Sequence, residues 1–318
     1  MSDVVSAAGR PAFPFSCIAH LLEHQARRIP HAPAILALGR APLTYGVLYQ
    51  HVRKTEQTLR TMGISRQDRL AVVLPNGPEL AAAILAVAAS ATCAPVNPDY
   101  QAEELDRYFS DLRPRALITQ AGIDSPARRV ARSRGIRIVE LSTASDAEAG
   151  VFMLSGDEGN VAPDKPVSAS DIALLLPTSG TTSRPKIVPQ SHANVCVSAY
   201  ATSAALALRE SDRCLNVLPL FHGHGLNATL MASLSAGASV ICTSGFDGNN
   251  FSAWLTAFRP TWFSAVPTMH QAILAQAAHN REVLANSRLR FVRSSSAALS
   301  PHTFAELERT FESPVIEW

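Results

Sequence analysis

The sequence lacks the features of a secreted, membrane-embedded or nucleic-acid-binding protein. Its five cysteines are scattered without a C-x-x-C pair, which indicates buried thiols in a reducing, cytoplasmic compartment rather than a disulfide framework. Met1–Ser16 has no basic start followed by an apolar stretch, so no secretory signal is predicted. No long run of Lys or Arg occurs and the net charge is +2, so neither nucleic acid nor an anionic membrane is expected as a partner.

Long hydrophobic runs are also absent. The most apolar stretch, Leu80–Val96, is rich in alanine and is interrupted by Ser90 and Pro95. A membrane-spanning helix needs about 20 consecutive apolar residues, so this stretch instead predicts a buried helix that leads into a strand. The composition, with 47% hydrophobic and 17% charged residues, is typical of a globular enzyme and not of a disordered chain.

Short apolar runs alternate with segments of helical length along most of the chain. A first series begins with a predicted strand at Arg69–Leu74 and ends with one at Ile136–Leu141. A second series begins with a strand at Ile172–Leu176 and ends with a helix that has Ser300 as its N-cap and Pro301 at its first position. Such alternation predicts an α/β fold, in which helices cover both faces of mainly parallel sheets.

The break between the two series predicts how the chain is divided. Residues 142–170 are rich in Ser, Ala, Gly, Asp and Glu and contain two prolines, which is typical of a surface connection. We therefore expect two doubly wound subdomains, one at residues 15–141 and one at residues 171–318, in one multilayered unit.

The most informative stretch joins a predicted strand to a polar loop that ends in a lysine. From Leu174 it reads L-L-L-P-T-S-G-T-T-S-R-P-K, so five hydroxyl side chains and one glycine precede Lys186. A polyphosphate needs hydroxyl and backbone N–H donors, a glycine that permits close approach, and a cation. Loops of Ser, Thr and Gly are often only solvated turns, and the spacing fits neither a Walker A motif nor a kinase glycine loop. Composition alone leaves both interpretations open.

This loop resembles the signature loop of the adenylate-forming superfamily, which includes acyl-CoA synthetases, firefly-type luciferases and the adenylation domains of peptide synthetases. The family loop reads T-S-G-T-T-G-x-P-K-G. Seven of its eight fixed positions up to the lysine are present here, as Thr178, Ser179, Gly180, Thr181, Thr182, Pro185 and Lys186. The resemblance implies that the loop binds the β- and γ-phosphates of ATP through Thr178, Ser179, Gly180, Thr181, Thr182 and Lys186.

Four further stretches agree with the same family in order and spacing, from about Phe15 onward. They are Leu43-Thr44-Tyr45, Gly77–Asp99, Pro219–Leu226 and Arg293–Pro301. The resemblance implies that His222 and Gly223 border the acyl substrate. It also implies that the adenine lies against four residues, mainly through their backbone: Ser295, Ser296, Ala297 and Ala298.

The resemblance implies a reaction in two steps. A carboxylate attacks the α-phosphate of Mg²⁺-bound ATP to form an acyl-adenylate, and a thiol, usually that of coenzyme A, then displaces AMP. Activation is needed because a free carboxylate resists nucleophiles, and catalysis rests on positioning and charge stabilisation. The expected partners are ATP, coenzyme A and a carboxylic acid. The acid remains open among small acids, dicarboxylates such as oxalate and malonate, and fatty acids, and a carrier-protein thiol remains an alternative to coenzyme A.

Two other interpretations of Pro219–Leu226 and its surroundings are weaker. His222 and His224 form an H-x-H pair, but no nearby Cys, Asp or Glu completes a metal site, so no metal ligand is predicted. Gly223–Ala228 fits G-x-G-x-x-A, as in an NAD(P)-dependent oxidoreductase, but the next predicted strand, Ala238–Cys242, is not followed by an acidic ribose ligand. A serine hydrolase is not expected because no G-x-S-x-G occurs.

The chain departs from the family pattern at three glycines and at its end. Ser183, Ile187 and Ser295 stand where glycine is common, and each costs about 1–2 kcal/mol if its φ must be positive. Trp318 stands where an aromatic-Gly-x-Thr-Glu motif should begin. The resemblance therefore implies a truncated N-terminal domain, without the magnesium-side glutamate and without the C-terminal domain whose lysine is catalytic. No catalytic residue is predicted within the chain itself.

A truncated chain admits a function from a different class. It is then a non-catalytic remnant that binds nucleotide weakly or not at all, or one part of a split enzyme that needs a separate C-terminal fragment.

Overall fold

Two seven-stranded sheets organise the computed structural model, which describes residues 15–178, 186–277, 280, 283–284 and 286–318. The strands of the first sheet are β3 (Arg69–Val73), β4 (Thr92–Pro95), β5 (Ala116–Gln120), β6 (Arg137–Ser142), β7 (Met153–Ser155), β8 (Ile172–Pro177) and β9 (Ile187–Ser191). Those of the second sheet are β1 (Pro33–Leu36), β2 (Leu43–Thr44), β10 (Arg213–Asn216), β11 (Ser239–Cys242), β12 (Trp262–Ala265), β13 (Phe291–Ser294) and β14 (Val315–Glu317). The strand orders are β7-β6-β5-β3-β4-β8-β9 and β14-β13-β12-β10-β11-β1-β2.

Both sheets are parallel except at their edges. The antiparallel pairs are β6 with β7 and β8 with β9 in the first sheet, and β1 with β2 in the second. Parallel neighbours need crossover connections, which helices provide. The helices are α1 (Ile18–Arg28), α2 (Tyr45–Thr61), α3 (Pro78–Ala88), α4 (Ala102–Leu112), α5 (Pro126–Ser133), α6 (His192–Ala205), α7 (Gly223–Gly225), η1 (Leu226–Met231), α8 (Ala232–Ala236), α9 (Phe251–Phe258), α10 (Pro267–Ala275) and α12 (Pro301–Phe311). The predicted α/β fold with mainly parallel sheets is confirmed.

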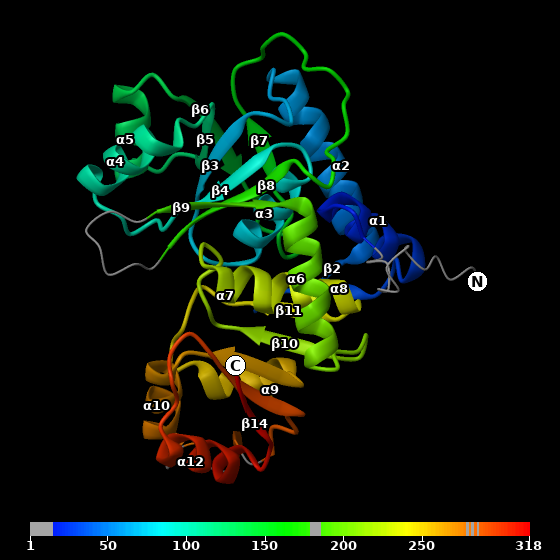
Figure 1. Cartoon of the computed structure of the whole chain (residues 1–318), viewed down its shortest axis with the longest axis vertical. Helices are drawn as coiled ribbons and strands as arrows, with labels where there is room; N and C mark the ends of the chain where they lie inside the picture. Colours follow the sequence, from blue (N-terminus) through cyan, green and yellow to red (C-terminus); the bar gives the residue numbers. More distant parts are fainter. Residues whose placement is uncertain (1–14, 179–185, 278–279, 281–282, 285) are drawn as a thin grey trace.

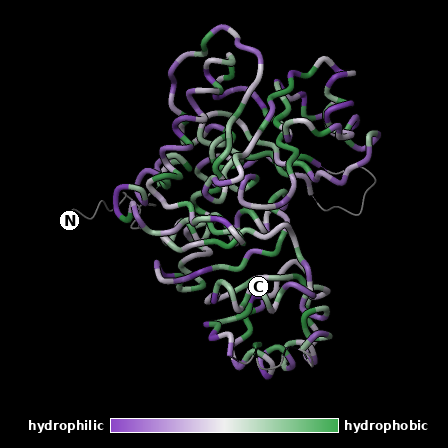
Figure 2. Tube along the Cα trace, turned by 180° about the vertical axis from the view of Figure 1, so that it is seen from behind, coloured by the Kyte–Doolittle hydropathy of each residue, from purple (hydrophilic) through white to green (hydrophobic). Residues whose placement is uncertain are grey.

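Three clusters of buried side chains define five layers of helix and sheet (Figure 1). The largest cluster lies between the two sheets and includes residues of α1, α2, α3, α6 and α8. Alternate side chains of one strand point to opposite faces, so Val72 of β3 faces this cluster while Val73 faces α4 and α5. Helices α9, α10 and α12 cover the outer face of the second sheet. Figure 2 shows the same division, with hydrophobic residues along the inner layers and hydrophilic residues in the peripheral loops.

The apolar stretch Leu80–Val96 forms a buried helix and strand. Every residue from Leu80 to Ala88 is buried in α3, and β4 follows. Its alanines let the helix lie in the central layer, close to both sheets. Within the described ranges no helix is long and apolar enough to cross a membrane. The helix after Ser300 also forms, with the Ser300 hydroxyl accepting from the backbone N–H of Thr303.

The sheets exchange strands across the predicted subdomain boundary. β1, from the N-terminal part, pairs with β11 in the second sheet, where Ile35 lies opposite Val240. β8 and β9, from the C-terminal part, extend the first sheet beyond β4. Residues 142–170 also contain β7, and Phe152 just before it is buried. The subdomain division remains a prediction, but neither sheet follows it, because an apolar run does not show which distant strand it will pair with.

Candidate functional site

The second sheet has a topological switch point beside β10. From β10 the chain crosses to β11 on one side, and it then returns to place β12 on the other side. In open parallel sheets, ligands bind outside the carboxyl ends of the strands at such a point, because the loops diverge to opposite faces. A ligand of this sheet is therefore expected beside the segments that follow β10, β12 and β13.

The Pro219–Leu226 segment lies at this switch point. A Cβ on Gly225 would lie 2.3 Å from the carbonyl oxygen of Pro219, so the turn packs too closely for any other residue. The segment leads through α7 into the π-helix η1, a form that is frequent at functional sites. Residues 217–222 separate β10 from Gly223, so these glycines do not form the tight strand-to-helix turn of a dinucleotide site. Of the two glycines, Gly225 is required by backbone packing, whereas Gly223 has no atom closer than 3.9 Å to the position of a Cβ.

The predicted acyl-side residue His222 is half-buried at the same point. Its ring contacts Phe221 edge to face, with centroids 4.9 Å apart. Burial lowers its pKa below the ordinary value of 6.5, so the ring is neutral at pH 7. Over the described parts of the chain its ring nitrogens have no hydrogen-bond partner, and they remain available to a ligand.

His224 belongs to a hydrogen-bonded chain that crosses the switch point. Its Nε2 lies 2.7 Å from Oγ of Ser264 on β12, and its Nδ1 lies 3.0 Å from Oγ of Ser296 after β13. Ser264 Oγ also accepts from Nη1 of Arg293 at 3.3 Å. The Ser264 hydroxyl thus lies between the imidazole of His224 and the guanidinium of Arg293. Burial, then the charges of Arg293 and His270, lower the pKa of His224 to about 4.

The predicted adenine-side residues, Ser295 to Ala298, directly follow β13. The N–H of Ser295 donates to the carbonyl of Ala265 at 3.3 Å, which keeps this segment beside the end of β12. Ser296 has a φ of 75°, whereas Ser295 and Ile187 are not in the positive region, so neither of those two positions needs glycine. Ser183, the third replaced glycine, lies outside the described residues.

The antiparallel pair β8–β9 carries the two ends of the predicted phosphate loop. The N–H of Thr178 donates to the carbonyl of Lys186 at 2.8 Å, and the N–H of Lys186 donates to Oγ1 of Thr178 at 3.2 Å. The hairpin thus joins the first and last predicted phosphate ligands, and Lys186 is exposed. The other predicted ligands lie outside the described residues: Ser179, Gly180, Thr181 and Thr182.

One contact joins this hairpin to the helix that follows the switch point, and a second joins the end of β3 to the loops after β10 and β11. Nδ2 of Asn227 in η1 donates to Oε1 of Gln190 in β9 at 2.9 Å. Asn76, after β3, accepts from the N–H of Leu220 at 2.9 Å and donates to the carbonyl of Thr243 at 3.0 Å. The carboxyl edges of both sheets therefore face one region.

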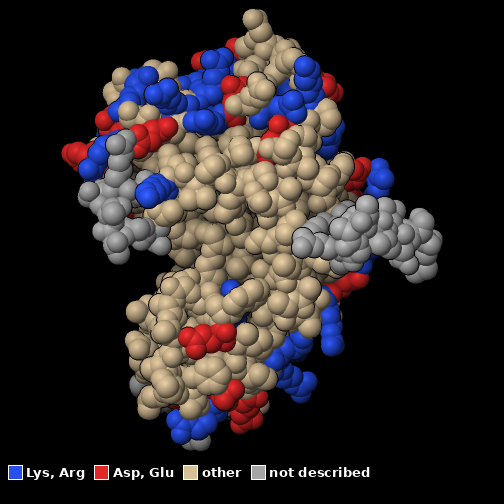
Figure 3. All heavy atoms as spheres, viewed as in Figure 1, with Lys and Arg blue, Asp and Glu red and all other residues tan. Residues whose placement is uncertain are grey.

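The surface is hollowed on the side where β8 ends and β9 begins. Figure 3 shows this hollow between an upper part and a lower lobe that contains α10 and α12, with charged side chains gathered over the top and the bottom. Among the residues that the structure describes, no group of three or more His, Cys, Asp or Glu could hold a metal ion.

Sequence reasoning missed Ser264 and Arg293 as candidates. Ser264 is fully buried in β12, and Arg293 is 4% exposed in β13. The sequence does not distinguish Arg293, because the strand predicted at 290–293 has an arginine at each end and only the second of them is buried. For Ser264 the sequence has no signal, since serine is common in strands of every kind.

Comparison with known proteins defines the class. A family model described as AMP-binding enzyme matches residues 22–318, and the chain belongs to this family, as its motifs imply. It is similar to the oxalate-CoA ligase of Arabidopsis thaliana, with 38% identity over 304 residues that cover 93% of this chain and 59% of the relative. It is also similar to the oxalate-CoA ligase of Saccharomyces cerevisiae, with 33% identity over 278 residues that cover 80% of this chain and 50% of the relative.

Solved structures show the same fold. ATP-bound MatB from Rhodopseudomonas palustris matches with a TM-score of 0.78 and 23% identity, over 94% of this chain and 59% of that one. A long-chain-fatty-acid-CoA ligase from Archaeoglobus fulgidus matches with a TM-score of 0.81 and 19% identity, over 95% and 63%. The chain thus spans between half and two thirds of the length of these proteins.

Proposed function

We propose that the protein takes part in ATP-dependent activation of a carboxylic acid and its transfer to coenzyme A, as an AMP-forming acid-thiol ligase. One observation carries the proposal: the hairpin that joins Thr178 to Lys186 lies against the switch point where His222 and Gly223 are found. Membership of the AMP-binding family and similarity to CoA ligases support it.

In this proposal the triphosphate lies along the hairpin tip. The hydroxyl and N–H groups of Thr178–Thr182 and the ammonium of Lys186 bind the β- and γ-phosphates. Such charge-assisted hydrogen bonds are about twice as strong as neutral ones. The adenine lies against Ser295–Ala298. The acid lies between the triphosphate and the adenine, next to His222. Mg²⁺ would be held largely by the phosphates, which is how this ion commonly binds nucleotides.

The chemistry that these positions support is displacement at phosphorus. A carboxylate oxygen attacks the α-phosphorus, and the bond from that phosphorus to the bridging oxygen of the β-phosphate breaks. Pyrophosphate leaves with its negative charge balanced by Lys186. The thiol sulfur of coenzyme A then attacks the acyl carbon, its proton is lost to solvent, and AMP leaves. The neutral His222 ring can donate one hydrogen bond to the acid without neutralising the attacking carboxylate.

The first test measures Mg-ATP binding to the chain by calorimetry. Lys186→Ala should weaken binding about 30-fold, because a hydrogen bond to a charged group contributes about 2 kcal/mol. Lys165→Ala, which removes an exposed lysine from the 142–170 segment, is the matched control and should bind as the unaltered chain does.

The second test measures oxalate-dependent exchange of pyrophosphate into ATP. The chain is assayed alone and joined to the C-terminal part of the Arabidopsis thaliana relative. Exchange in either form supports the proposed reaction. If only the joined form catalyses exchange while the chain alone binds Mg-ATP, this chain binds the nucleotide and the reaction needs the C-terminal part. If neither form binds Mg-ATP or catalyses exchange, the proposal is wrong and the chain is a non-catalytic remnant.

A further inference from the structure

The β8–β9 hairpin has a single backbone anchor in the first sheet. Among the described residues, Leu174 of β8 lies opposite Cys93 of β4, and no other position of these two strands is paired. Pro95, at the end of β4, has no N–H with which to continue the ladder toward the hairpin tip. The Thr92 hydroxyl adds one hydrogen bond to the carbonyl of Ile172, on the side away from the tip. Because β9 lies at the edge of the sheet, its outer side has no neighbouring strand.

A second anchor reaches the hairpin from the second sheet. Nδ2 of Asn227 in η1 donates to Oε1 of Gln190 in β9 at 2.9 Å, and Gln190 is paired with Leu174 across the hairpin. The hairpin is therefore held from both sides at one level, by β4 on the side of β8 and by Asn227 on the side of β9. Asn227 is itself well fixed, since it is only 9% exposed and its helix directly follows the tightly packed Gly225.

The predicted phosphate ligands lie beyond these two anchors. Lys186 is four residues before Gln190, which corresponds to about 13 Å along a strand. Its carbonyl still pairs with the N–H of Thr178, so the hairpin geometry continues to this point. Alternate side chains share a face, so Lys186 lies on the face of β9 that carries Gln190, and Ile187 lies on the outer face. A small rotation about Leu174 therefore becomes a large displacement of Lys186.

The amide pair is poorly suited to stabilising the fold by itself. Oδ1 of Asn227 is buried without a partner among the described residues. A buried acceptor without a donor costs at least as much free energy as one ordinary hydrogen bond contributes, so the bond to Gln190 brings no clear net gain. Two aliphatic side chains would bury similar surface without that cost. A hydrogen bond, however, restricts direction as well as distance, which is what positioning needs.

We propose that Asn227 is a positioning residue: through Gln190 it fixes the direction of the hairpin and so sets where the Lys186 ammonium meets the triphosphate. The inference rests on the proposed function, in which Lys186 binds the nucleotide. Asn227 acts on the nucleotide only through the direction of β9. Its effect on nucleotide affinity should therefore be smaller than the effect of Lys186, and it should disappear when the Lys186 side chain is removed.

The test measures Mg-ATP binding by calorimetry and the melting temperature without ligand. It uses the chain alone or, if only that form binds, the chain joined to the C-terminal part of the Arabidopsis thaliana relative. Asn227→Leu removes the hydrogen bond at similar size and should weaken binding about fivefold, which is about 1 kcal/mol. Its melting temperature should stay the same or rise. In a chain that already carries Lys186→Ala, Asn227→Leu should change the affinity by less than about twofold.

Variants of Gln190 supply the rescue and the second half of the cycle. Gln190→Leu should weaken Mg-ATP binding as much as Asn227→Leu does, and the two together no further, because both remove one contact. Gln190→Glu keeps acceptor oxygens for Asn227 and should retain the affinity of the unaltered chain. Gln67→Leu and Asn249→Leu remove exposed amides elsewhere and are the matched controls, which should bind Mg-ATP normally.

Three results overturn the inference while the proposed function stands. The first is unchanged Mg-ATP affinity in Asn227→Leu. The second is a fivefold loss that persists in the presence of Lys186→Ala, because Asn227 then acts independently of Lys186. The third is a large drop in the melting temperature of Asn227→Leu, which would make Asn227 a structural residue. Absence of Mg-ATP binding in both forms of the unaltered chain instead rejects the proposed function, and the inference with it.

Discussion

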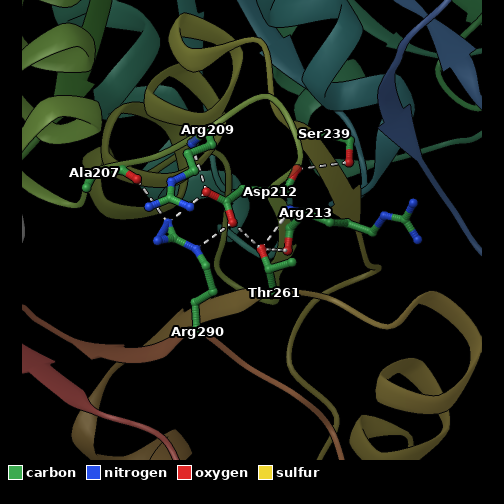
Figure 4. Close-up of polar contacts among 7 residues, drawn as sticks. All are labelled: Ala207, Arg209, Asp212, Arg213, Ser239, Thr261 and Arg290. Atoms are coloured by element: carbon green, nitrogen blue, oxygen red, sulfur yellow. Dashed lines mark hydrogen bonds and ion pairs between the residues drawn. The ribbon is translucent and has the colours of Figure 1, made fainter.

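In the second sheet, the amino and carboxyl ends of the strands differ in whether a buried charged side chain has a counterion within the described chain. At the amino end, Asp212 is 2% exposed and accepts two hydrogen bonds of 2.8 Å from Arg290 (Figure 4). It also accepts from the Thr261 hydroxyl at 2.7 Å and from the N–H of Arg209 at 2.8 Å. Each lone pair of the carboxylate has a donor, and the contacts tie the loops before β10, β12 and β13 together.

At the carboxyl end, the buried guanidinium of Arg293 has a serine and no carboxylate among the described residues. The amino edge is complete by itself, and its ion pair contributes to folding. The carboxyl edge holds a buried guanidinium whose contacts in the described residues are a serine hydroxyl and the Trp318 ring. The difference teaches that burial of a charged side chain does not by itself show whether the charge is paired.

The largest effect of a single substitution is expected when the amino edge is broken. Asp212→Asn should lower the free energy of unfolding by about 3 kcal/mol, because Arg290 then keeps its charge without a counterion in a mostly buried place. Urea unfolding measures this change. Asp124→Asn removes a partner of Arg129 from an exposed pair and should have little effect. Equal losses in the two variants would contradict the distinction between buried and exposed pairs.

A smaller loss is expected from steric change at the carboxyl edge. Gly225→Ala should lower the free energy of unfolding by about 2 kcal/mol, because the new Cβ meets the backbone of Pro219. Gly223→Ala is a matched control from the same motif, since its Cβ would have no neighbour closer than 3.9 Å. It should unfold like the unaltered chain. Similar stability of the two variants would show that Gly225 is not held by this packing.

The carboxyl edge should also make the protein sensitive to acid. Burial lowers the pKa of His224 and His270 from 6.5 to about 4. Between these values the unfolded chain binds protons that the folded chain does not. The free energy of unfolding should therefore fall as the pH drops through this interval, by about 1.4 kcal/mol per pH unit for each histidine. Stability above pH 6.5 should not depend on these two groups.

Urea unfolding across that pH interval measures the slope. Arg293→Met removes a positive charge beside His224, so it should raise the pKa of that histidine and reduce the slope. His192, buried against α1 with a pKa lowered to about 4, adds a contribution far from this edge. His192→Gln should also reduce the slope of the free energy of unfolding against pH, through a group that does not belong to the carboxyl edge. If the unaltered chain, Arg293→Met and His192→Gln lose stability equally as the pH falls, groups other than His224 and His192 cause the loss.

Much of the fold could be predicted because it depends on neighbouring residues. Phe251–Phe258 and Pro301–Phe311 form helices where the periodicity and the Ser300 cap predict them. The hairpin strand β9 was missed, since Ile187–Ser191 contains a proline and none of its residues is fully buried. The predicted ligands of the phosphate loop between Thr178 and Lys186 remain predictions. The burial of Arg293 could not be predicted from the sequence, because it becomes visible only when the surroundings of a side chain are known.

The sequence by itself determined the membership of the AMP-binding family and the alternation of strands and helices, since motifs and periodicity are properties of consecutive residues. Only the tertiary structure decided that β8 and β9 extend the first sheet and that Gln190 of β9 meets Asn227 of η1, beside the second sheet. It also decided that Asp212 has its counterion and that Arg293 has none in the described chain. The physical reason is that desolvation and pairing of charges depend on segments that meet only after folding.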